Sequence, residues 1–352
     1  MATPAAPRGR GTAANPPNRF APARSVAQDD GWYQEVPLTQ GTEVRFETAK
    51  TIITRNSSPD LPFDRSINPY RGCEHGCIYC YARPSHAYWD LSPGLDFETR
   101  LIAKTNAVAL LEQQLSKPGY VCAPINLGAN TDPYQPIERE HRLTRQLLDV
   151  LLRYRHPVTI ITKGSLILRD LDLLAELAQQ RLVSVMISLT TLDDELKRIL
   201  EPRAAAPKAR LRAIRVMREA GIPVGVLCSP MIPMINDCEL EHLLREAKAA
   251  GAMSANYMML RLPLEVAPLF EQWLHTHYPQ RAAHVLSLIR QSRGGQLYDS
   301  RFGSRMRGEG VFADLLAQRF ATALRRQGLN RRGDFSLDCS AFCPPGGQMA
   351  LL

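Results

Sequence analysis

The sequence contains no apolar run approaching the roughly 20 residues that a membrane-spanning helix requires. It also lacks an apolar core behind its N-terminal charges, which a secretory signal would show. We therefore expect no membrane association and a cytoplasmic location. Cysteine is scarce too, because eight cysteines among 352 residues are too few for a disulfide scaffold. Three of them, Cys73, Cys77 and Cys80, are crowded together, which suggests metal binding or catalysis.

Acidic residues are missing from the beginning of the chain. Residues 1–28 carry four Arg and no acid, residues 290–352 carry ten Arg and five acids, and the net charge is +8. The middle of the chain is thus almost neutral and both ends are basic. Basic ends are compatible with phosphate binding, but a solvated periphery explains them as well. We favour the periphery because an Arg excess alone is not specific.

Large apolar side chains are rare in residues 1–30, which are rich in Ala, Pro and Arg. Such a segment buries too little surface to offset its chain entropy, so we expect a disordered basic tail. An organellar transit peptide shares this composition, but the dense prolines disfavour the amphipathic helix that it needs. We divide the remainder into an N-terminal extension (31–65), a core (66–290) and a basic, helical C-terminal extension (291–352).

From about residue 66, short apolar strands alternate with longer helical segments. The patterns predict helices at residues 97–115, 138–154, 168–180, 209–220, 239–250, 264–276, 282–293 and 311–327. A first strand is expected just before Cys73, followed by strands at residues 124–127, 158–162, 183–189, 224–228 and 255–260. Short apolar strands of this kind are typical of buried parallel sheets. The succession predicts an α/β fold with a parallel barrel, complete or open, although a doubly wound sheet gives a similar pattern.

Polar and reactive residues follow the predicted strands one after another. The three cysteines follow the first strand, residues 130–132 the second, Lys163 the third and Ser188 the fourth, and residues 230–237 follow the fifth. In parallel barrels the loops after the strands share one face, and functional groups gather there. We therefore expect these residues at one mouth of the barrel.

The cysteines occupy the segment Asn68-Pro69-Tyr70-Arg71-Gly72-Cys73-Glu74-His75-Gly76-Cys77-Ile78-Tyr79-Cys80-Tyr81-Ala82-Arg83. This spacing lets one short loop present three thiolates to three irons of a [4Fe–4S] cluster, and two glycines permit its tight turns. Since protein clusters usually have four cysteine ligands, one iron remains open to another ligand. Two alternatives compete: a zinc site completed by His75 or His86, and an electron-transfer cluster completed by Cys339. We favour the open cluster because no second pair of zinc ligands lies at a suitable spacing.

This segment resembles the defining motif of the radical S-adenosylmethionine (SAM) superfamily, including the aromatic Tyr79 before the third cysteine. The resemblance implies a [4Fe–4S] cluster whose open iron binds SAM, with Tyr79 packed near the adenine. It also implies an enzyme that cleaves SAM reductively to a 5′-deoxyadenosyl radical, which abstracts hydrogen from a substrate. A reducing partner such as flavodoxin or ferredoxin would supply the electron.

More narrowly, the segment looks like the DNA repair photolyase-like branch related to spore photoproduct lyase, and the likeness extends to about residue 290. It implies a partial (β/α)6 barrel with the helical C-terminal extension. In it Thr131 takes the position of a cofactor-contacting hydroxyl, Lys163 that of a cation near the cofactor carboxylate, and Ser188 that of a ribose contact. Arg203 is a weaker candidate for the cofactor carboxylate, since a surface ion pair explains it too.

The sequence departs from this branch at one position. Spore photoproduct lyase-like enzymes carry a hydrogen-donating cysteine beside the hydroxyl after the second strand, whereas the neighbour of Thr131 here is Asn130. Cys122, the nearest thiol, lies several residues earlier, so repair of thymine lesions by that route is not expected. Tyr79 and Tyr81 match the aromatic positions beside the third cysteine, and we take Tyr81 as the candidate catalytic residue for relaying a hydrogen atom.

We thus expect a radical SAM enzyme, with nucleic acid as the leading substrate class. The competing hypothesis is a zinc-stabilised nucleic-acid-binding module that uses the basic ends and has no redox catalysis. Cys339 and Cys343, three residues apart, offer two ligands for a second metal, which alone make a poor site.

Overall fold

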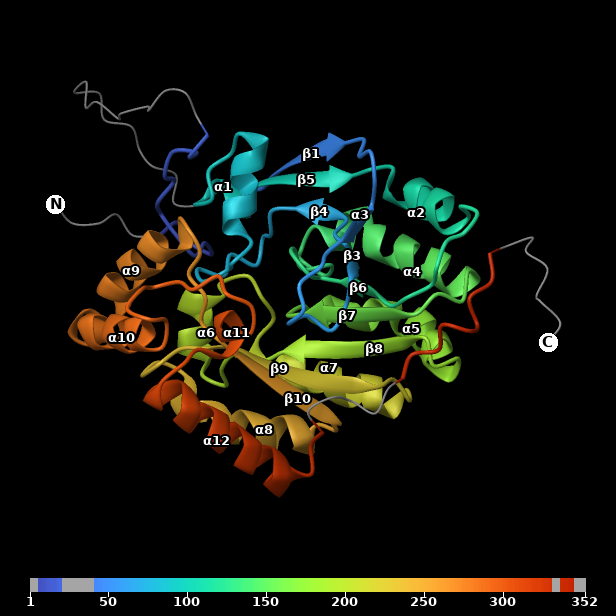
Figure 1. Ribbon diagram of the computed structural model, residues 1–352. Helices are drawn as coiled ribbons and strands as arrows, with labels where there is room; N and C mark the ends of the chain where they lie inside the picture. Colours follow the sequence, from blue (N-terminus) through green and yellow to red (C-terminus); the bar gives the residue numbers. More distant parts are fainter. Residues whose placement is uncertain (1–5, 21–40, 331–335, 345–352) are drawn as a thin grey trace.

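The computed structural model describes residues 6–20, 41–330 and 336–344. Its main sheet has seven strands in the order β10-β9-β8-β7-β6-β3-β2. Neighbouring strands are parallel except for the antiparallel pair of β2 and β3. The bounds are β2 Ile53–Arg55, β3 Arg65–Ile67, β6 Ile125–Leu127, β7 Val158–Thr162, β8 Val183–Ser188, β9 Val224–Met231 and β10 Ser254–Met259. Six consecutive parallel strands confirm the predicted partial (β/α)6 barrel (Figure 1).

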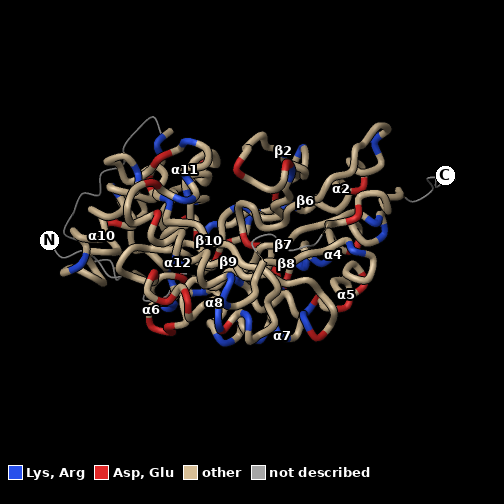
Figure 2. The backbone as a smooth tube through the Cα atoms, turned by 60° about the horizontal axis from the view of Figure 1, so that its bottom comes forward, with Lys and Arg blue, Asp and Glu red and all other residues tan. Residues whose placement is uncertain are grey.

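Helices connect the parallel strands. They are α3 Glu138–His141, α4 Leu143–Arg153, α5 Leu171–Gln179, α6 Asp194–Leu200, α7 Pro207–Glu219 and α8 Leu240–Ala249, with 3-10 turns η2 Ser165–Asp170 and η3 Asp237–Glu239. Figure 2 shows α5, α7 and α8 along the same face of the sheet. Fully buried aliphatic side chains of strands and helices, such as Ile160, Val226 and Leu244, fill the space between them. This buried layer holds the strand ends in place and so fixes the loops that follow them.

Two of the predicted helices are wrong in part. The segment 97–115 divides into α1 Asp96–Thr99, the strand β5 Arg100–Lys104 and α2 Ala107–Leu115. β5 lies in a second, three-stranded sheet between β1 Glu43–Glu47 and β4 Tyr70–Arg71. Pairing with strands distant in sequence outweighed the local helical pattern. The segment 138–154 is interrupted at Arg142, whose φ of 52° is left-handed.

The beginning of the chain also differs from the prediction of a disordered tail. Residues 6–20 lie against the body, where the Arg10 guanidinium donates to the Glu98 carbonyl at 2.7 Å and the Gly11 amide to the Glu98 carboxylate at 2.8 Å. Polar contacts, not apolar burial, hold this stretch, which is why its composition gave no sign of them. Residues 1–5 and 21–30 of the predicted tail lie outside the described residues.

The described part of the C-terminal extension contains helices, as predicted. After the last strand come α9 Val266–His277 and α10 Pro279–Gln291, and the extension itself holds α11 Ser304–Arg307 and α12 Val311–Gln327. Nearer the beginning of the chain, the turn η1 Arg83–Trp89 follows the cysteines. Helix α12 packs against α8 and β10 at the edge of the sheet. Among the described residues, no helix has the length and apolar character needed to cross a membrane.

Candidate cofactor site

The cysteine loop leaves β4 and turns back on itself. The Cys73 amide donates to the Phe97 carbonyl at 2.9 Å, and the Cys80 amide donates to the Cys77 carbonyl at 3.2 Å. Gly72 and Gly76 have φ values of 74° and 66°, a region that residues with a side chain rarely adopt. The glycines therefore make the tight turns that the motif predicts.

The loop borders a cavity of about 380 Å³. Its lining combines the three cysteines with residues at or just beyond the carboxyl ends of five strands, among them Asn130, Asp132, Lys163, Ser188, Pro230 and Arg261. The structure thus places these residues together at one mouth of the barrel.

The thiols fit a [4Fe–4S] cluster better than a single metal ion. Among the described side chains, no three His, Cys, Asp or Glu converge on one point as ligands of one ion would. The proposed zinc ligand His86 does not face the thiols as a free ligand, because its Nε2 lies 2.9 Å from the Arg100 carbonyl. A cluster suits three thiols placed around a cavity, because each binds a different iron. Burial raises the pKa of Cys77 to about 12, so the bare thiol is neutral and bound iron would be needed to deprotonate it.

The candidate fourth cysteine ligand is not at the site. Cys339 contacts Cys122, and neither residue lines the cavity. The electron-transfer alternative, in which Cys339 completes the cluster, is therefore not supported. No thiol other than Cys73, Cys77 and Cys80 lines the cavity in the described part of the chain.

A buried carboxylate connects the cysteine loop to the barrel. Glu201 accepts hydrogen bonds from the Tyr79 hydroxyl, the Arg210 guanidinium and, at 2.7 Å, the Thr190 hydroxyl. Burial alone would raise the pKa of Glu201, but the charges of Arg210 and Lys163 lower it to about 2. The carboxylate is thus ionised and holds Tyr79 in one position. Glu201 and Arg210 were not predicted as site residues, because their residue types and spacing carry no distinguishing signal.

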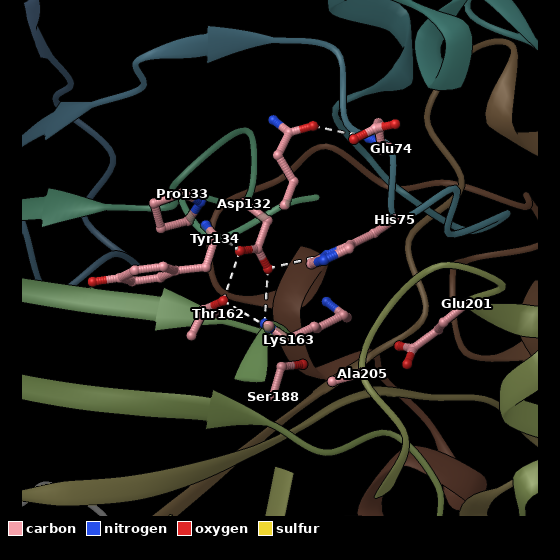
Figure 3. A network of polar contacts seen from close by, with 12 residues as sticks. Glu74, His75, Asp132, Pro133, Tyr134, Thr162, Lys163, Ser188, Glu201 and Ala205 are labelled. Atoms are coloured by element: carbon pink, nitrogen blue, oxygen red, sulfur yellow. Dashed lines mark hydrogen bonds and ion pairs between the residues drawn. The ribbon is translucent and has the colours of Figure 1, made fainter. Parts of the chain in front are cut away.

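A second carboxylate joins the loops after β6 and β7 (Figure 3). Asp132 accepts hydrogen bonds from the Thr162 hydroxyl at 2.6 Å and the Lys163 amide at 2.7 Å. The Nδ1 atom of His75, in the cysteine loop, lies 3.3 Å from Asp132 Oδ2, the oxygen that also accepts from the Lys163 amide. Burial raises the pKa of Asp132, but His75 and the hydrogen bonds more than offset this, so the pKa is held below its usual range. Asp132 therefore fixes the backbone of Lys163 relative to the cysteine loop.

Besides the three cysteines, the structure brings four of the predicted site residues together at the cavity: Tyr79, Tyr81, Lys163 and Ser188. Lys163 Nζ lies 5.8 Å from the centroid of the Tyr79 ring. Burial lowers the pKa of Lys163, but the Glu201 carboxylate and, once it is ionised, the Cys77 thiolate outweigh burial and raise the pKa, so the ammonium stays charged. Tyr81 donates its hydroxyl proton to the Ala129 carbonyl.

Two predicted contacts are not at the cavity. The Thr131 hydroxyl is buried and donates to the Tyr70 carbonyl at 3.0 Å, because Asn68 holds the loop backbone in that orientation. Arg203 forms an ion pair with Glu74 at 3.0 Å, which compensates a nearly buried carboxylate. Both side chains therefore make local structural contacts: the Thr131 hydroxyl bonds a backbone carbonyl, and Arg203 forms an ion pair.

These features place three thiols, a lysine and a serine around one cavity at the mouth of a partial parallel barrel. The model of the Radical SAM superfamily matches residues 67–247, so the chain belongs to the radical SAM superfamily. It is accordingly a radical SAM enzyme, and the superfamily implies a [4Fe–4S] cluster and SAM as its cofactors.

Relatives cover most of the chain. An uncharacterised protein of Mycobacterium tuberculosis is 40% identical over 266 residues, which are 74% of this chain and 78% of that protein. An uncharacterised protein of Methanocaldococcus jannaschii is 28% identical over 214 residues, 61% of this chain and 76% of that protein.

Solved structures share the fold. Spore photoproduct lyase complexed with dinucleoside spore photoproduct has a TM-score of 0.57 at 15% identity, covering 80% of this chain and 79% of that one. A variant of this lyase with bound SAM and dinucleoside spore photoproduct has a TM-score of 0.54 at 16% identity, covering 81% and 78%.

Proposed function

We propose that this enzyme cleaves SAM reductively and abstracts a hydrogen atom from a nucleic-acid substrate. The observation that carries the proposal is the single cavity shared by three thiols, a charged lysine and a serine hydroxyl. Cys73, Cys77 and Cys80 would hold three irons and leave the fourth open. When bound, the reduced cluster supplies the electron that breaks the cofactor's bond to its 5′ carbon.

The other residues bind and orient the cofactor in this proposal. The Lys163 ammonium pairs with its carboxylate, and the Ser188 hydroxyl hydrogen-bonds its ribose. Tyr79, held by Glu201, forms one wall of the cavity and excludes water from the cluster side.

Tyr81 is the proposed hydrogen-atom relay. Its ring lines the cavity, and Asn130 lines it where spore photoproduct lyase-like enzymes carry a cysteine. A phenol is therefore the better-placed hydrogen carrier among the described lining residues. Repair of thymine lesions through a cysteine donor is not part of the proposal.

Nucleic acid as the substrate rests on the basic ends of the chain and on the dinucleoside bound by the similarly folded lyase. A flavodoxin or ferredoxin remains the predicted electron donor, and the cytoplasm the predicted location.

The test is anaerobic reconstitution of the full chain with iron and sulfide, followed by reduction in the presence of SAM. We expect 5′-deoxyadenosine from the wild type and at least a hundredfold less from Cys73→Ala, as an order-of-magnitude expectation for loss of a cluster ligand. The same substitution at the exposed Cys238 is the control and should leave the yield unchanged. Equal yields from wild type and Cys73→Ala would refute the proposal. So would one equivalent of zinc and no iron in protein purified without air.

A further inference from the structure

Three cations line the cavity, and two of them already have acidic neighbours. The charge of Lys163 is balanced by the nearby Glu201 carboxylate. Arg305 of α11 is paired with Asp60, which accepts from its Nε at 2.7 Å. Asp60 also accepts from the Gly303 amide at 3.2 Å, so the segment after β2 contacts the residues at the beginning of α11.

Arg261 is the third cation, and it has no such partner. Its Nε is buried and forms no hydrogen bond, and Nη1 lies 3.6 Å from the sulfur of Met306, a weak acceptor. No carboxylate within the described residues lies at ion-pair distance from its guanidinium. A buried donor without an acceptor costs free energy, and proteins rarely leave a charged one in this state without a use.

The position of Arg261 separates it from the proposed cofactor contacts. Its guanidinium lies 5.3 Å from the Tyr81 ring, whereas Lys163 lies beside Tyr79. Tyr79 is 8% exposed and Tyr81 is 44% exposed. Arg261 therefore lies toward the solvent side of the cavity, where a substrate would enter, and Lys163 toward the cluster side.

The neighbouring side chains favour a nucleic-acid strand at this entrance. Phe302 is 58% exposed, and the Arg305 guanidinium lies 4.7 Å above its ring. An exposed aromatic ring can stack on a base, and a guanidinium can donate two hydrogen bonds to one phosphate. Because Asp60 compensates Arg305, Arg261 is the lining arginine with unused hydrogen-bonding capacity.

We propose that Arg261 binds a phosphodiester of the substrate and thereby places the adjoining nucleoside beside Tyr81. This inference rests on the proposed function and adds the residue that recognises the substrate. It assigns Arg261 a positioning role, since the group that it would bind is the strand and not the reacting carbon.

The test compares two probes on the reconstituted full chain: the dinucleotide thymidylyl-(3′→5′)-thymidine, which carries one phosphodiester, and thymidine, which carries none. We expect wild type to bind the dinucleotide more tightly, and Arg261→Gln to weaken that binding about tenfold or more, as loss of a charge-assisted hydrogen bond implies. Thymidine binding should change little in the same variant. Arg261→Lys should retain part of the preference, which guards against a folding defect, and iron content should match wild type.

Arg307→Gln is the matched control. Arg307, on α11, carries the same charge as Arg261, but it is exposed and does not line the cavity. It should bind the dinucleotide as wild type does. Equal affinity of wild type for both probes, or unchanged dinucleotide binding by Arg261→Gln, would overturn the inference. An equal loss of SAM and dinucleotide affinity would also overturn it, because the bound anion would then be the cofactor carboxylate. In each of these cases, 5′-deoxyadenosine formation by wild type would still support the proposed function.

Discussion

At the scale of single residues, the position of Tyr79 depends on one buried pair of opposite charges. Glu201 and Arg210 are almost completely buried, and the Arg210 guanidinium also donates to the Ser188 carbonyl at 3.0 Å. The pair thereby links the strand end that carries Ser188 to the ring of Tyr79. A buried pair of this kind contributes little net stability, but breaking it leaves one charge without compensation.

We predict that Glu201→Gln lowers the free energy of unfolding by about 3–5 kcal/mol, because Arg210 would keep its charge in the interior. Urea unfolding of the full chain measures this change. Glu195→Gln on α6 is the control, since Glu195 is exposed and lies 3.8 Å from Arg198. Its effect should stay below about 1 kcal/mol, as for other surface pairs. Similar losses in both variants would show that the buried network does not matter.

At the scale of elements, the cysteine loop tolerates only glycine at its turns. A Cβ on Gly76 would lie 2.6 Å from a Glu98 carboxylate oxygen, and Glu98 is held by Arg83 and by the Gly11 amide. The carboxylate therefore cannot move aside without breaking buried contacts. The loop geometry depends on this packing as well as on the local backbone.

We predict that Gly76→Ala lowers the iron bound after reconstitution to less than about half of the wild-type amount, because the displaced loop misplaces its thiols. Iron and sulfide analysis measures this. Gly119→Ala is the matched control, because Gly119 has a similar φ of 77° and its Cβ would meet nothing within 4 Å. The control carries the backbone strain, about 1 kcal/mol, without the clash. Full iron content in Gly76→Ala would show that the clash is absorbed elsewhere.

The elements also show where local pattern fails. Residues 311–327 form α12 as predicted, because the apolar side chains that it buries recur at helical spacing along the sequence. Residues 100–104 became a strand because Tyr70 and Glu43, both far from them in sequence, pair with this segment. Strand pairing is a long-range interaction, so a window of neighbouring residues does not contain it.

At the scale of the whole molecule, the C-terminal segment packs against parts of the chain that are remote in sequence. The Phe342 ring lies 5.4 Å from the rings of both Tyr120 and His156. His156 is buried, with Nε2 2.8 Å from the Tyr120 hydroxyl and Nδ1 3.0 Å from the Pro157 carbonyl. Burial lowers the pKa of His156 from 6.5 to about 4.

This shift makes stability depend on pH. The unfolded chain binds a proton at His156 near pH 6.5 and the folded chain near pH 4, so stability is complete above the first value and falls as pH drops toward the second. At about pH 5 the loss from this group is on the order of 2 kcal/mol. We predict that His156→Gln reduces the stability difference between about pH 7.5 and about pH 5 by that amount in urea unfolding. The same change at exposed His275 should leave the difference unchanged, and equal slopes for wild type and His156→Gln would contradict the prediction.

The sequence by itself determined the cysteine loop, the succession of strands and helices, and the mouth at which Lys163 and Ser188 meet the thiols. These features follow from spacing within a few residues and from the rule that parallel strands end at one face. Only the tertiary structure decided that Thr131 and Arg203 serve local contacts, that Glu201 and Arg210 support Tyr79, and that Arg261 has no acidic partner among the described residues. Whether a charge is paired depends on side chains that folding brings together from distant positions, and neither spacing nor composition contains that information.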